Sequence, residues 1–167
     1  MDLLDFEAKR LYFQQADSEE VQDLIEQASG LYGRGEAELP LLKAYLRAPE
    51  SLNVLVALNR FYYYQHRLNE ALLISEKALN LLAASINFPM DWQQVDLAHI
   101  NSAPKSMLSQ IRLYLFTLKS VGFLQMRLEN LTVSQRIFQK LILLDEKDRI
   151  GAKALLELNQ QRQNPAE

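Results

Sequence analysis

The residues of this chain best suited to acid–base or metal chemistry are its two histidines, His66 and His99. Asp96 precedes His99 by three residues, a spacing that brings a carboxylate and an imidazole to one face of a helix, where they could share a metal ion. A zinc site needs further ligands, but the other histidine is distant in sequence and the chain has no cysteine. We therefore expect no metal site. We interpret His99 as a polar residue of a short helix and His66 as an exposed residue of a turn.

No motif of nucleophilic or nucleotide chemistry accompanies these residues. The sequence lacks G-x-S-x-G, P-loop and G-x-G-x-x-G patterns, and the Gly-Arg-Gly-Glu turn at residues 33–36 follows no predicted strand. The paired carboxylates Glu19 and Glu20 fall in the first turn of a predicted helix, where they favour its dipole. The absence of cysteine excludes disulfides and thiolate catalysis. We expect a protein that is not an enzyme, with no catalytic residues and no cofactor.

The composition is that of an ordinary globular chain. Its 167 residues are 49% hydrophobic and 23% charged, and only five glycines and five prolines favour long helices over many short strands. A net charge of −3 without any basic cluster argues against nucleic acid or anionic lipid as a partner. The most apolar stretch, residues 111–124, contains two basic residues and is too short to span a bilayer. Since the chain starts with an acidic segment, unlike a signal peptide, we expect a cytoplasmic protein that does not bind membranes.

Several helix starts can be predicted from capping residues. Asp17 with Glu20, and Thr132 with Gln135, have the spacing of a capping box, in which side chains bond the free amides of a first turn. Asn69 is predicted to cap a further helix that runs to about residue 84. Apolar residues recur with helical spacing behind these positions. The sequence therefore predicts an all-α fold.

Two consecutive segments, residues 18–51 and 52–85, align with a shift of 34 residues and no gap, which places Ala37 on Ala71 and Ala44 on Ala78. Repeats of this length are helix–turn–helix units that stack to bury a shared core and commonly form binding scaffolds. A third copy, residues 115–148, is recognised by Gly122, Ser134, Phe138 and Leu141.

Four segments lie outside the repeats: residues 1–17, an N-terminal helix or extension; 86–114, an insertion with one short helix and the start of a long one; 149–162, a capping helix; and 163–167, a disordered tail. The long helix is predicted to run from Pro104, a residue favoured in a first turn, to Arg127. Together with the repeats, these segments are predicted to form one domain over residues 1–167.

The repeats resemble tetratricopeptide repeats, most clearly in the middle copy with Leu55, Leu58, Tyr62, Glu70-Ala71 and Lys77-Ala78-Leu79. The resemblance implies a stack of three antiparallel helix pairs, with small residues where helices touch closely, an insertion before the third repeat and a C-terminal capping helix. Asn59 stands where the family usually has glycine, and Ser75 where a large aromatic residue is common. A generic bundle of α-hairpins is the alternative.

The resemblance also implies a binding site, because family members hold a peptide or a partner helix on the concave surface built by the first helix of each repeat. In this chain the first repeat would contribute Gln22, Glu26 and Ser29, and the second would add Asn53. The partner-binding residues predicted for the second and third repeats are Val56, Arg60, Tyr63, Tyr64, Lys119, Phe123, Met126 and Arg127. The positions of the family's carboxylate clamp hold Glu19, Gln22, Asp23, Glu26, Val56 and Ala57, so an apolar peptide or helix suits this groove better.

Four consecutive aromatic residues, 61–64, cover more than one face of a helix, so at least one of them points away from the core. We expect Tyr62 in the core and Tyr63 or Tyr64 on an interaction surface, since tyrosine often contributes to binding energy. A subunit contact, or packing beneath the N-terminal helix, is the alternative. Tyr63, Tyr64, Phe123 and the insertion are predicted to converge at the junction of the second and third repeats.

The expected function is therefore that of an adaptor or assembly factor that binds another protein. Two alternatives remain. The size and architecture resemble those of small bacterial secretion-type chaperones, which would act as a homodimer. A structural protein that self-associates through the long helix and the insertion around Trp92 is the second alternative.

Overall fold

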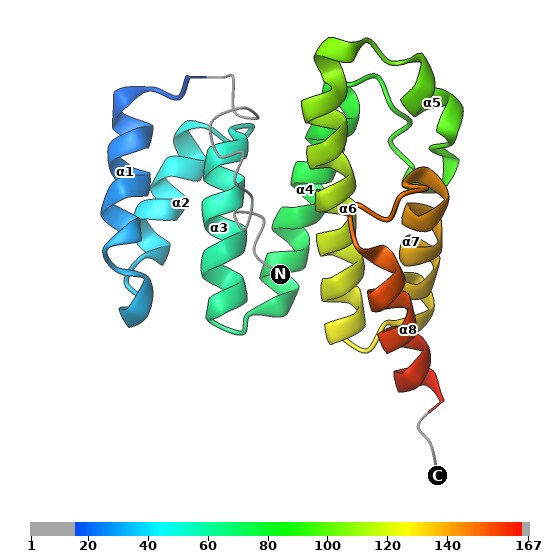
Figure 1. The fold of residues 1–167 in the computed structure, drawn as a ribbon. Helices are drawn as coiled ribbons and strands as arrows, with labels where there is room; N and C mark the ends of the chain where they lie inside the picture. The colour runs from blue at the N-terminus through cyan, green and yellow to red at the C-terminus, as the bar shows by residue number, and fades with distance from the viewer. Residues whose placement is uncertain (1–15, 165–167) are drawn as a thin grey trace. The chain divides into compact units, whose positions relative to one another are not determined.

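The part of the chain that the structure describes is helical (Figure 1). The computed structural model describes residues 16–164, apart from the side chain of Arg34, and has no strand among them. The helices are α1 (Glu19–Ser29), α2 (Glu38–Arg47), α3 (Leu52–Tyr64), α4 (Leu68–Ser85), α5 (Leu97–Ser102), α6 (Leu108–Arg127), α7 (Leu131–Leu144) and α8 (Ala152–Gln163). The all-α prediction is confirmed. The predicted N-terminal helix and most of the predicted tail lie outside the described residues.

The chain divides into two compact units, Met1–Ala78 (unit 1) and Leu79–Glu167 (unit 2), and the boundary falls inside α4. Within unit 1, α1 packs against α2, and α2 packs against α3 (Figure 1). Within unit 2, α7 packs against both α6 and α8 (Figure 1). A single domain over residues 1–167 stays a prediction.

The small residues matched by the 34-residue shift are all buried in the structure. Ala37, Ala44 and Ala71 are 0% exposed, and Ala78 is 3% exposed. An alanine at such a position lets a neighbouring helix approach more closely than a larger residue would. The 34-residue period therefore correctly predicts that these four positions are buried.

Two inter-helix turns share one geometry. His66, after α3, has φ 56°, and Glu129, after α6, has φ 62°. In both turns the next amide bonds back to a carbonyl five residues earlier, at 2.9 Å, as in a Schellman motif. Since this turn leads directly into the next helix, α4 and α7 begin at residues 68 and 131, one residue before Asn69 and Thr132. The predicted caps at these two positions are therefore wrong.

The start of α1 also differs from the prediction. The Ser18 hydroxyl, and not Asp17, caps this helix by accepting the Val21 amide at 3.3 Å. The predicted capping box of Asp17 and Glu20 is therefore wrong by one residue. Asp17 is engaged elsewhere, by two side chains described below.

The insertion contains more helix than expected. A 3₁₀ helix at Trp92–Gln94 precedes α5, and a second at Lys105–Met107 follows Pro104. The long helix α6 therefore begins four residues after Pro104 and has 20 residues. The Lys140 ammonium on α7 donates to the carbonyls of Gln93 and Val95, both at 2.8 Å, and so connects the insertion to α7 within unit 2.

The capping helix starts later than residue 149. Gly151, with φ 74°, precedes α8. The Asp145 carboxylate accepts the Ile150 amide at 2.7 Å, and the Asp148 carboxylate accepts the Lys153 amide at 3.2 Å. These two carboxylates satisfy amides around the start of the helix that would otherwise lack partners.

Candidate functional site

Unit 1 contains a pocket of about 380 Å³, which we call the α1–α3 pocket. Its walls come from the segment before α1, from α1, from Tyr32 and from α3. The lining residues are Asp17, Gln22, Ile25, Glu26, Ser29, Tyr32, Asn53, Val56, Ala57 and Arg60. Six residues predicted on the concave surface line this pocket: Gln22, Glu26 and Ser29 of α1, and Asn53, Val56 and Arg60 of α3.

The pocket pairs a polar wall with an apolar floor. The α1 residues Gln22, Glu26 and Ser29 are exposed. The α3 residues Val56 and Ala57 are only 4% and 5% exposed. An apolar site with a few polar groups at its edge is the usual form of a small binding pocket, in which the apolar surface provides affinity and the polar groups provide orientation.

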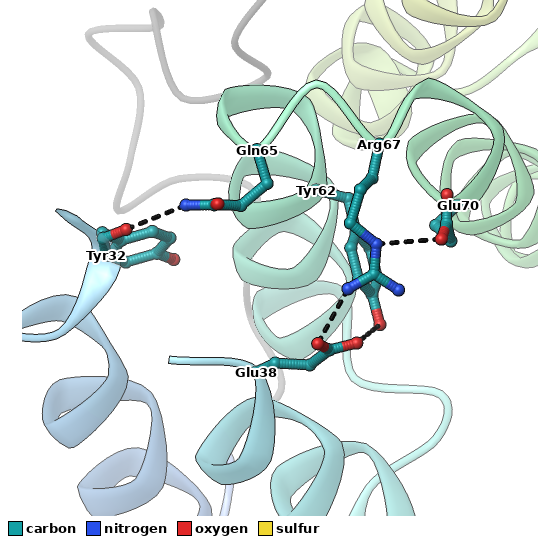
Figure 2. Close-up of polar contacts among 6 residues, drawn as sticks. All are labelled: Tyr32, Glu38, Tyr62, Gln65, Arg67 and Glu70. Atoms are coloured by element: carbon teal, nitrogen blue, oxygen red, sulfur yellow. Dashed lines mark hydrogen bonds and ion pairs between the residues drawn. The ribbon is translucent and has the colours of Figure 1, made fainter. Parts of the chain in front are cut away.

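Tyr32, in the 3₁₀ helix after α1, links this helix to α3. Its hydroxyl donates to the Ala57 carbonyl at 3.2 Å. Its own carbonyl accepts from the Gln65 amide group at 3.1 Å (Figure 2). Its ring lies 6.0 Å from the ring of Phe61, which is buried. Tyr32 therefore holds one part of the pocket wall in a fixed place.

Tyr63 and Tyr64, the tyrosines predicted on an interaction surface, follow Arg60 on α3 and do not line the pocket. The Arg60 guanidinium lies 6.0 Å from the Tyr32 ring and 5.8 Å from the Tyr64 ring, within range of cation–π attraction. Tyr64 is 54% exposed, and its ring meets that of Tyr63 edge-on at 5.6 Å. Tyr62 is 6% exposed, which confirms its assignment to the core.

A polar network that the sequence analysis did not identify joins three helices of unit 1 (Figure 2). The Arg67 guanidinium donates to Glu38 of α2 at 2.7 Å and to Glu70 of α4 at 2.9 Å. The Tyr62 hydroxyl of α3 donates to Glu38 at 3.2 Å. Hydrogen bonding to Arg67 lowers the pKa of Glu70, whereas burial, and then Glu38, raises the pKa of Tyr62. Since each carboxylate has a cationic partner, the network acts as a brace for the helices.

Asn59 and Ser75, the two departures from the repeat pattern, turn out to be bonded to each other. The Asn59 side-chain amide donates to the Ser75 hydroxyl at 2.6 Å and to the Ala71 carbonyl at 2.8 Å. Asn59 and Ser75 are 2% and 0% exposed. A larger residue on α3 is thus matched by a smaller one on α4, and their polar groups satisfy each other.

The four partner-binding residues predicted on α6 have different environments. Met126 is 0% exposed, so its side chain belongs to the core of unit 2 and not to a partner-facing surface. Lys119 is 9% exposed, and its ammonium donates to the Ile150 carbonyl at 2.5 Å, so it is a buried hydrogen-bond donor and not a partner-facing residue. Burial lowers its pKa. Phe123 and Arg127 are half-buried, with the guanidinium 5.9 Å from the ring.

Tyr63 and Tyr64 lie in unit 1, and Phe123 and the insertion lie in unit 2. Their convergence at one junction therefore stays a prediction.

The Asp96–His99 pair forms a helix cap. The Asp96 carboxylate accepts the His99 amide at 3.2 Å, and the His99 Nδ1 accepts the Asp96 amide at 3.1 Å. The hydrogen bond from the His99 amide lowers the pKa of Asp96. Within residues 16–164, no three potential ligands among histidines and carboxylates group around a metal position. Within the same residues, no helix is both long and apolar enough to cross a membrane.

The comparisons with known proteins identify a relative. It is the "Uncharacterized 19.8 kDa protein in nifW 5'region" of Azotobacter chroococcum mcd 1, and it is 37% identical over 158 residues, which cover 95% of this chain and 88% of the relative. The chain belongs to the family of that protein. No protein-family model matches the chain. No solved structure matches it either.

Proposed function

We propose that this protein is a cytoplasmic, non-enzymatic binding module of the tetratricopeptide type, and that its α1–α3 pocket holds an apolar peptide or helical segment of another protein. The observation that carries the proposal is the pocket itself. Six residues chosen from the repeat pattern as an inner, partner-facing surface line one 380 Å³ pocket in unit 1, with an apolar floor and a polar wall.

Matching features after α3 and α6 support the proposed repeat. The ends of these helices, Tyr64 and Arg127, differ by 63 residues, and so do the starts of α4 and α7, Leu68 and Leu131. The left-handed turn residues between them differ by the same number. A shift of 63 is also the offset between the second and third copies in the sequence, 115 minus 52.

The buried contacts at equivalent positions support it as well. Asn59 bonds to the Ala71 carbonyl on the next helix, and the Ser134 hydroxyl bonds to the Gly122 carbonyl at 2.8 Å, both pairs being twelve residues apart. Each pair joins the first helix of a proposed repeat to the second.

Matched tryptophan substitutions on α1 test the proposal. Ser29 is exposed and lines the pocket, whereas Gln27 is exposed and lies about 200° away around the same helix. Ser29→Trp should fill the pocket and reduce capture of partner proteins from the native cell at least tenfold, while Gln27→Trp should leave capture unchanged. Equal capture by both variants and the wild type would count against the proposal. Because the relative is named for its place in the nifW 5′ region, products of the genes that neighbour this chain's own gene are the first partners to test.

A self-associating assembly is the second candidate, and an exposed stripe on α2 favours it. Leu39, Leu42 and Leu46, at positions i, i+3 and i+7, are 61%, 39% and 79% exposed. Exposed apolar patches commonly mark protein–protein contacts. A dimeric mass in light scattering that becomes monomeric in Leu42→Asp/Leu46→Asp would support this candidate, including its chaperone-like form.

A further inference from the structure

The described part of the chain begins at the α1–α3 pocket. Asp17 lines the pocket, and two other lining residues hold it there. The Asn53 side-chain amide donates to the Asp17 carboxylate at 2.7 Å, and the Gln22 side-chain amide donates to the Asp17 carbonyl at 2.8 Å. Residues that precede Asp17 in sequence are therefore covalently attached at the wall of the pocket.

Residues 1–15 have side chains that would suit this pocket. Apolar and aromatic residues are frequent among them, separated by charged and polar ones: Leu3, Leu4, Phe6, Leu11, Tyr12 and Phe13. The apolar floor formed by Val56 and Ala57 can bury such a side chain, while the polar α1 wall can bond to backbone or charged groups beside it.

We propose that residues 1–15 occupy the α1–α3 pocket of their own molecule and compete there with an external partner. Only the competition with a partner rests on the proposed function. The occupancy of the pocket is inferred from the attachment point and from the apolar sequence of the segment. The segment would thus act as an internal ligand that sets the threshold for partner binding.

Because the segment is covalently attached beside the pocket, a weak contact would be enough to keep the pocket occupied. Fifteen residues reach up to about 50 Å when extended, and α1, with 11 residues, is only about 16 Å long. A short tether gives an effective concentration of about 1 mM, so an intrinsic Kd of about 0.1 mM would keep the pocket about 90% occupied. An external partner would then bind about tenfold more weakly than to an empty pocket.

Disulfide trapping in the full chain tests the occupancy. Because the chain has no cysteine of its own, an engineered pair is the only one present. Asp5→Cys is combined with Ser29→Cys in the pocket, or with Gln27→Cys on the other side of α1 as the matched control. Oxidation with copper–phenanthroline and oxygen, followed on non-reducing gels, gives the rate of each cross-link.

We expect the Ser29 pair to close about tenfold faster than the Gln27 pair and to yield a cross-linked monomer. Adding Leu4→Ser and Phe6→Ser should bring the two rates together. Equal rates with the native segment would overturn the inference. A cross-linked dimer as the main product would also overturn it, because the occupant would then be the segment of a second copy.

The trapping experiment and the capture experiment can fail independently of each other. If trapping is selective but Ser29→Trp captures the same proteins as Gln27→Trp, the internal ligand stands and the external binding function fails. If trapping is not selective but Ser29→Trp loses partners, the binding function stands and the internal ligand fails.

Discussion

Gly122 gives the sharpest test of how tightly α6 and α7 pack. A Cβ atom added to this residue would lie 2.7 Å from Cγ2 of Ile137 and 2.8 Å from Cε1 of Phe138. Carbon atoms in contact normally lie about 3.5–4.0 Å apart. Ile137 and Phe138 are both 0% exposed, so neither side chain has open space to move into.

We therefore expect Gly122→Ala to destabilise the protein. Alanine is favoured over glycine inside a helix by about 1 kcal/mol, which opposes the effect. Overpacking a close-packed core costs about 1–3 kcal/mol. Because the two contacts are about 0.7–0.8 Å shorter than the normal distance, we expect a cost at the upper end of this range. The net loss in free energy of unfolding should be about 1–2 kcal/mol.

The assay is urea unfolding followed by the fluorescence of Trp92. This residue is the only tryptophan of the chain, and it lies in unit 2 with Gly122. Gly33→Ala is the control, because a Cβ at Gly33 would have no atom within 4 Å; followed by circular dichroism, it should be neutral or stabilising by up to about 1 kcal/mol. A Gly122→Ala protein as stable as the wild type would refute the packing argument.

Three further predictions follow from buried contacts and turns. Asn59→Gly and Ser75→Phe should each lower the free energy of unfolding. The double variant, which copies the Gly122–Phe138 pair, should be at least about 2 kcal/mol more stable than the sum of the two single losses predicts in a double-mutant cycle. Additive losses would contradict the matching of these positions. His66→Gly and Glu129→Gly should each raise the free energy of unfolding by about 0.5–1 kcal/mol, because both residues have positive φ; a loss of stability on thermal melting would argue otherwise. Lys119 has a pKa below its ordinary value of 10.5, so the unfolded chain binds more protons there and stability rises with pH toward 10.5. Relative to Lys119→Met, wild-type stability should therefore increase as the pH rises toward 10.5, and a parallel pH profile would contradict the burial argument.

The helical fold and its positions of close packing could be predicted because they depend on spacing within short segments. Ala37 and Ala71 are buried as the period indicates, and six of the residues predicted to face a partner on α1 and α3 line one pocket, although Tyr63 and Tyr64 do not. Helix starts were less predictable. Before Asn69 and Thr132, left-handed turns at His66 and Glu129 lead directly into the helix. These turns depend on a C-terminal bond back to the previous helix, which the N-cap patterns at Asn69 and Thr132 do not encode.

Contacts between distant residues could not be derived from one sequence. Asn59 and Ser75 each depart from the repeat pattern, but only the fold shows that one compensates for the other. Lys119 lies at a position that would face a partner in a regular repeat. The loop before α8 provides the Ile150 carbonyl instead, and this removes Lys119 from the surface.

Photo-cross-linking in the native cell tests the central claim, that the α1–α3 pocket binds another protein, most directly. A small aliphatic diazirine amino acid, which leaves the pocket open, is placed at Ser29, which lines the pocket, and separately at Gln27, which lies on another face of α1. We expect a discrete cross-linked partner from position 29 that is absent from position 27 and is identified by mass spectrometry. The same cross-links from both positions, or no intermolecular product from position 29, would contradict it.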